Sequence, residues 1–152
     1  MNAQLEQMLA RGRSERIAPQ DLAEWFAGLA PADCDFMQGG WTGGVFNTGH
    51  PGETLLTQLC WCGKDFNSTE DVAPIICRDD QGRRVVNDAM GAARLRMILA
   101  PGETLPTAAM VYDKHAIIDH FKRLDDHTVL GVMDSKGDAF PLYFYLQRWH
   151  GE

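Results

Sequence analysis

Hydrophobic residues follow two spacings along the chain, and the first of them is helical. Between residues 19 and 30 the large apolar side chains recur at positions i, i+3, i+4 and i+7, on one face of a helix: Leu22, Trp25, Phe26 and Leu29. Pro19 and Asp21 suit its first turn, because proline tolerates that position and a carboxylate favours the positive end of the helix dipole. We therefore expect helices over the first thirty residues, and a further short helix over residues 51–62.

From residue 74 onward, apolar and polar residues alternate with the period of a strand. In residues 92–100, AARLRMILA, Leu95 and Met97 face one way while Arg94 and Arg96 face the other. Residues 127–149 give the clearest hairpin signal, because the polar run DSKGDA separates two apolar runs. Several short strands at close spacing predict an antiparallel meander, which avoids exposed edges most simply by closing into a barrel.

A tryptophan among glycines marks an early predicted strand. In GGWTGG, residues 39–44, the side chains of Gly39, Trp41 and Gly43 share one face. The two glycines leave room for the indole to lie flat, and they let the strand bend as a small barrel requires. Lipocalin-type barrels begin with such a Gly-x-Trp, whose indole closes one end beneath an arginine from the last strand. We expect Trp41 to be this plug first and a ligand contact second, with Arg148 over its ring.

A family resemblance rests on several short motifs. They are GGWTG at residues 39–43, TGHP at 48–51, WCGKDF at 61–66, ARLRM at 93–97, MVYDKHAIIDHFKRLDDHTVLGVMDSKG at 110–137 and YFYLQR at 143–148. With these motifs the chain resembles the GXWXG-domain proteins, in which the signature is followed by a C-terminal domain of unknown function. One departure is Ala116, where that family more usually shows proline. The resemblance implies a bacterial, cytoplasmic protein with a lipocalin-like barrel, and it implies no settled activity.

The expected architecture is therefore mainly β, an antiparallel lipocalin-like β-barrel with N-terminal helices. Residues 1–32 form the helical segment that packs on the barrel, and residues 33–152 form the barrel itself. A chain of 152 residues is long enough to bury a substantial core as one domain.

The composition of the chain limits which partners it can bind and which cellular compartment it suits. A formal net charge of -7 excludes a nucleic-acid binder, because phosphate attraction needs a basic surface. The N-terminal run MNAQLEQMLARGRSER has no long apolar stretch, which predicts a cytoplasmic protein without signal peptide or membrane span. In that reducing compartment the four cysteines are expected to be free thiols. Cys60 and Cys62 form one Cys-x-Cys pair, but a structural zinc site needs a second pair, so we expect neither a metal nor another cofactor.

An apolar barrel interior predicts a small-molecule carrier or sensor. A barrel of about eight strands can hold one small ligand, and methionines on the strands suit an adaptable lining. The expected ligand is hydrophobic or amphipathic, such as a fatty acid or phospholipid, with Arg96 turned inward to hold its anionic group. The expected ligand-binding residues are Trp41, Arg96, Met97, Met110, Tyr112, His120, Phe121, Met133 and Tyr143.

The alternative is a small barrel enzyme of the isomerase or hydratase type. His120 would then act as a general base with Asp113 or Asp119 as its partner. Adjacent strand residues face opposite ways, so Asp119 and His120 cannot both point inward in a regular strand, and no nucleophile with a neighbouring base is evident. A homodimer, formed through an exposed strand or the N-terminal helices, is a further expectation.

Overall fold

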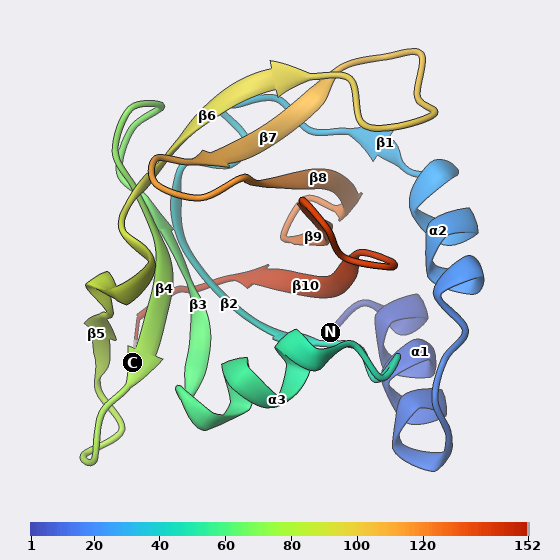
Figure 1. Cartoon of the computed structure of the whole chain (residues 1–152), viewed down its shortest axis with the longest axis horizontal. Coiled ribbons are helices and arrows are strands. Elements are labelled where there is room, and N and C mark those ends of the chain that lie inside the picture. The colour runs from blue at the N-terminus through green and yellow to red at the C-terminus, as the bar shows by residue number, and fades with distance from the viewer. Residues whose placement is uncertain (152) are drawn as a thin grey trace.

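The computed structural model of the chain describes residues 1–151 as a ring of strands with helices outside it (Figure 1). The α-helices of this part are α1 (Ala3–Ser14), α2 (Pro19–Ala27) and α3 (Pro51–Gln58), and η1 (Asp88–Met90) is a short 3₁₀ helix. The strands are β1 (Ala30–Pro31), β2 (Gly39–Val45), β3 (Trp61–Phe66), β4 (Val72–Arg78), β5 (Arg84–Val86), β6 (Ala93–Ile98), β7 (Thr107–Tyr112), β8 (Ile117–Asp125), β9 (Thr128–Ser135) and β10 (Leu142–Arg148).

Eight of the strands close into a barrel. Neighbours pair antiparallel in the order β8, β7, β6, β4, β3, β2, β10, β9, and β9 pairs with β8 to complete the ring. The pairing between β4 and β6 is short, and Val72 opposite Ala93 is the one residue pair in its register. Closure removes long exposed edges, which is the physical reason that the sequence pattern favours a barrel. The predicted antiparallel barrel with N-terminal helices is confirmed.

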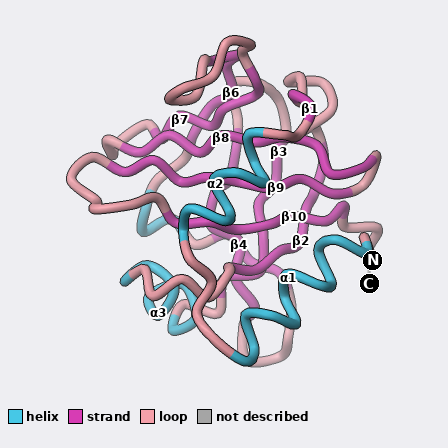
Figure 2. The backbone as a smooth tube through the Cα atoms, turned by 90° about the vertical axis from the view of Figure 1, so that its right-hand side faces the viewer, coloured by secondary structure: helices cyan, strands magenta, loops and turns pink. Residues whose placement is uncertain are grey.

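The helices α1 and α2 pack against the outer face of the barrel. In Figure 2, α2 crosses in front of β8 and β9, and α1 lies lower, near β2. The apolar face expected in α2 is formed, since Leu22 and Phe26 are buried. They belong to a cluster that also contains Leu130 of β9 and Tyr143 of β10. The protein thus has two hydrophobic clusters, one inside the barrel and one between its outer wall and these helices.

Trp41 is buried beneath Arg148, as the sequence predicts. Its side chain is 0% exposed, and the indole Nε1 donates a hydrogen bond to the carbonyl oxygen of Met37 at 2.8 Å. The guanidinium of Arg148 lies 4.4 Å from the indole centroid, which confirms the predicted cation–π contact. Arg148 also donates to the carbonyl oxygen of Phe36 at 2.7 Å, so the guanidinium is satisfied while it covers the ring.

Gly63 marks a close approach between β3 and β2. A Cβ at this position would lie 1.9 Å from the carbonyl oxygen of Trp41. Gly63→Ala is therefore expected to lower the free energy of unfolding by about 2–3 kcal/mol, because two strands must separate to admit the methyl group. Urea denaturation measures this, with Gly28→Ala as the control, since a Cβ there would be 3.7 Å from its nearest neighbour. Equal stability of the two variants would contradict the close approach.

Two local expectations are wrong. The third helix ends at Gln58 instead of continuing to residue 62, because Cys60 takes a left-handed conformation (φ 56°) that ends the turn, and Trp61–Phe66 is strand β3. Pro74 lies inside β4 and does not precede it.

Candidate functional site

Two consecutive residues of β8 have buried side-chain atoms without a hydrogen-bond partner among the described residues. The atoms are Oδ1 of Asp119 and both ring nitrogens of His120. Because side chains alternate along a strand, Asp119 points into the barrel and His120 points out of it. Buried polar groups nearly always have partners, so each side of β8 is a candidate site.

Inside the barrel, Asp119 forms an ion pair with Lys64 of β3. The distance from Nζ of Lys64 to Oδ2 of Asp119 is 3.2 Å, and Nζ also donates to the carbonyl oxygen of Pro74 at 3.1 Å. The ammonium lies 5.4 Å from the ring centroid of Trp61 and 5.2 Å from that of Phe144. Lys64 therefore has polar or aromatic partners on several sides and is held in place.

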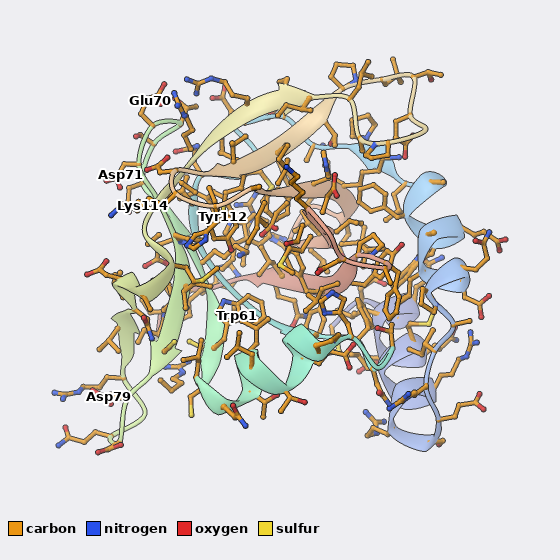
Figure 3. The ribbon with its side chains drawn as sticks, in the orientation of Figure 1. Trp61, Glu70, Asp71, Asp79, Tyr112 and Lys114 are labelled. Atoms are coloured by element: carbon orange, nitrogen blue, oxygen red, sulfur yellow. The ribbon has the colours of Figure 1, made fainter. Side chains whose placement is uncertain are left out.

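Burial shifts the pKa of both partners toward their neutral forms. Desolvation lowers the pKa of Lys64 and raises the pKa of Asp119, while the attraction between the two opposes each shift. Burial also raises the pKa of Tyr112 well above its usual value, with a second contribution from the charge of Asp119. Tyr112 belongs to the interior cluster, and Trp61, which lies close to α3 in Figure 3, packs against this cluster. This polar group is surrounded by closely packed apolar side chains, among them the fully buried Phe121.

On the outer side of β8, His120 lines a pocket of about 430 Å³. The strand register puts His120 opposite Val132 and Val132 opposite Tyr143, so these residues form one row across β8, β9 and β10. The helix α2 and the loop at residues 100–103 form the other walls of the pocket. The remaining lining includes Ala23, Phe26 and Ala27 of α2, Glu103 of the loop, Asp134 of β9, and Pro141.

His120 gives this apolar pocket a polar group. The side chain is only 2% exposed, although neither ring nitrogen has a hydrogen-bond partner within residues 1–151. Desolvation lowers the pKa of His120, and the charge of Asp134 opposes that shift only in part. The imidazole is then uncharged at neutral pH, with one nitrogen as a donor and the other as an acceptor. A ligand group that both donates and accepts hydrogen bonds would complement it.

Two of the residues expected to line the barrel interior lie outside its core. Arg96 is 45% exposed and forms an ion pair with Glu70 at 2.6 Å, so the expected inward anchor is wrong. The reason is the alternation of β6, where Ala93 and Leu95 take the inward positions. Met97 shares their side of the strand but lies beyond the core and is 45% exposed.

The structure also separates His120 from its expected acidic partners. Asp119 lies on the opposite face of β8 with Lys64, as the alternation argument requires. Asp113 is exposed in the turn between β7 and β8, and it makes no hydrogen bond to His120. The pairing on which the enzyme alternative depends is therefore not formed.

The other expected ligand-binding residues divide between the two sides of the barrel wall. His120 and Tyr143 line the outer pocket. The interior cluster contains Trp41, Met110, Tyr112, Phe121 and Met133. Sequence reasoning did not identify Glu103 and Asp134 as site residues, and the signal available for Asp134 was its place two residues from Val132 on the same face.

Within residues 1–151 no group of three or more His, Cys, Asp or Glu side chains could hold a metal ion. The four cysteines are free thiols. None of the helices in this part of the chain combines the length and the apolar character needed to cross a bilayer.

Comparisons with known proteins identify the family. The model of the GXWXG protein family matches residues 24–82, and that of the Domain of unknown function (DUF4334) matches residues 91–148. The chain is similar to a solved structure titled "Crystal structure of protein from Thermomonospora curvata", with 38% sequence identity, a TM-score of 0.87, and 98% of each chain covered. No curated protein matches the chain. The chain belongs to the GXWXG family, with the associated C-terminal domain of unknown function.

Proposed function

We propose that this protein is a carrier or sensor that binds a hydrophobic or amphipathic small molecule in the outer pocket. The observation that carries the proposal is His120, which is buried in the pocket wall and whose ring nitrogens have no hydrogen-bond partner in the described part of the chain. The walls around it are mostly apolar side chains, which is the usual construction of a small-molecule site. A volume of about 430 Å³ is also in the usual range for such sites.

The outer pocket is a better candidate than the barrel interior. In the interior, Met110 and Phe121 pack with 0% exposure into one continuous cluster with Trp41. A ligand there would have to displace close-packed side chains, which costs free energy. In the outer pocket a ligand would instead cover apolar surface and supply the hydrogen bonds that His120 lacks.

An isomerase or hydratase is less well supported. No carboxylate among the described residues orients His120, and a general base is normally held in place by such a partner. A ligand-binding role requires only that the imidazole donate and accept hydrogen bonds.

Nile red, an uncharged apolar dye, tests the proposed site. The wild-type protein is expected to bind it saturably, with a rise in fluorescence. His120→Phe is expected to weaken binding about tenfold, because the ring occupies pocket volume and removes the hydrogen-bonding nitrogens. The matched control is His127→Phe, since His127 is exposed in the turn between β8 and β9. Absence of saturable binding by the wild type, or equal binding by both variants, would contradict the proposal.

We also propose a cytoplasmic location. The four free thiols suit a reducing compartment.

A homodimer would find a strand edge at β5, which pairs with β4 and exposes Val85 and Val86. Gel filtration with light scattering measures the oligomeric state. Val86→Lys is expected to leave a monomer if this edge forms the interface.

A further inference from the structure

We infer that the outer pocket selects an uncharged ligand with a hydroxyl or carbonyl group and rejects carboxylates and phosphates. This inference rests on the proposed function, and it specifies the chemistry of the ligand. It also runs against the fatty acid or phospholipid expected from the sequence, because that expectation relied on Arg96 as an internal cation. Arg96 is instead on the outer surface with Glu70.

The charges around the pocket are acidic. None of its described lining residues is a lysine or arginine, whereas Glu103 and Asp134 are both part of the lining. The nearby Lys122 is already engaged, because its Nζ lies 2.7 Å from Oε1 of Glu103 and 4.9 Å from the ring centroid of Phe26. An anionic head group would therefore lose its hydration and approach fixed carboxylates without gaining a cation.

The polar groups of the pocket suit a neutral ligand. His120 and Tyr143 stand at the two ends of one row, with Val132 between them. Two strand spacings separate the ends of this row by roughly 10 Å along the sheet. An apolar body over Val132 would place a polar group at one end beside the imidazole of His120, whose buried nitrogens it would contact once the ring turns toward the pocket. A hydroxyl can donate to one imidazole nitrogen or accept from the other, and a carbonyl can accept.

A matched pair of competitors tests this selectivity. At pH 8, 1-decanol is uncharged and decanoate is anionic, while their apolar chains are nearly the same. We expect 1-decanol to displace Nile red at a concentration at least about ten times lower than decanoate does, because the pocket offers the carboxylate no cation. Equal or tighter binding of decanoate would overturn the inference and leave the proposed function standing. Failure of both competitors to displace a saturably bound dye would overturn both.

A charge reversal at the pocket provides the second test. Asp134→Lys places a cation at the pocket and changes an exposed residue, so the fold should tolerate it. Decanoate is expected to bind this variant about tenfold more tightly than it binds the wild type, while 1-decanol changes by less than about twofold. Asp80→Lys has the same change in net charge in the exposed turn between β4 and β5. If Asp80→Lys gained the same affinity for decanoate, or if Asp134→Lys gained none, the inference would be overturned.

Discussion

Replacing Lys64 by methionine is expected to lower the free energy of unfolding by about 3–5 kcal/mol, because it leaves Asp119 buried without its cation. The two groups lie 3.2 Å apart, and both are almost completely buried. Removing one partner of a buried pair costs more than the pair itself contributes, since the remaining charge cannot return to water. Urea denaturation at pH 7 measures the loss.

The pH dependence of this variant has a defined sign. Burial raises the pKa of Asp119, and Lys64→Met removes the attraction that opposes this rise. A carboxyl whose folded-state pKa is raised above its unfolded value favours the folded state at low pH, and that contribution is lost as the pH rises through the folded pKa. The destabilisation should therefore be smaller at pH 5 than at pH 7.

The double variant Lys64→Met with Asp119→Leu separates the contribution of the ion pair to stability from the contribution of side-chain packing. Two apolar side chains of similar length leave no buried charge, so the double variant should be more stable than Lys64→Met alone by about 2 kcal/mol or more. A double variant no more stable than the single one would show that Lys64 acts through packing, against the account of the interior given above.

Replacing Trp41 by alanine is expected to lower the free energy of unfolding by about 3–5 kcal/mol. The loss has three sources: the buried indole surface, the hydrogen bond to Met37, and the contact with Arg148. Chemical denaturation measures it. Trp149→Ala is the matched control, because Trp149 is 38% exposed although its ring also lies 4.4 Å from an arginine, Arg84. The control should lose less than about 1 kcal/mol, and equal losses would mean that Trp41 does not close the barrel.

The fold was predictable where the spacing of apolar residues matches the repeat of the helix or strand that forms. Leu22 and Phe26 in α2 follow the helical spacing and are buried together. The strands after residue 74 follow the alternating pattern, and the contact between Trp41 and Arg148 follows from glycines that leave room for an indole. In these elements each local preference agrees with the final structure.

Other features could not be predicted from the sequence, because the backbone is irregular where they occur. The pairing of β3 with β4 shifts register on both sides of Gly63, and such bulges change which residues point inward. They explain how Trp61 and Lys64 both reach the barrel interior although they are an odd number of residues apart. A simple alternation rule cannot place Lys64 beside Asp119.

The outer pocket depends on segments that lie far apart in the sequence. Its walls come from α2, from the loop at residues 100–103 and from strands β8 to β10. The sequence identifies His120 and Tyr143 as candidates, but their common row depends on the register of β9 between them. No local pattern contains that register, because it is set by the turns and by closure of the barrel.

Methyl NMR with 1-decanol tests most directly where the ligand binds. The account predicts that the largest chemical-shift changes fall on the methyl groups of Ala27 and Val132, which line the outer pocket. Met110 and Met133, whose side chains pack in the interior cluster, should change little. The largest changes at those two methionines, with Ala27 and Val132 unaffected, would place the ligand inside the barrel and contradict the account.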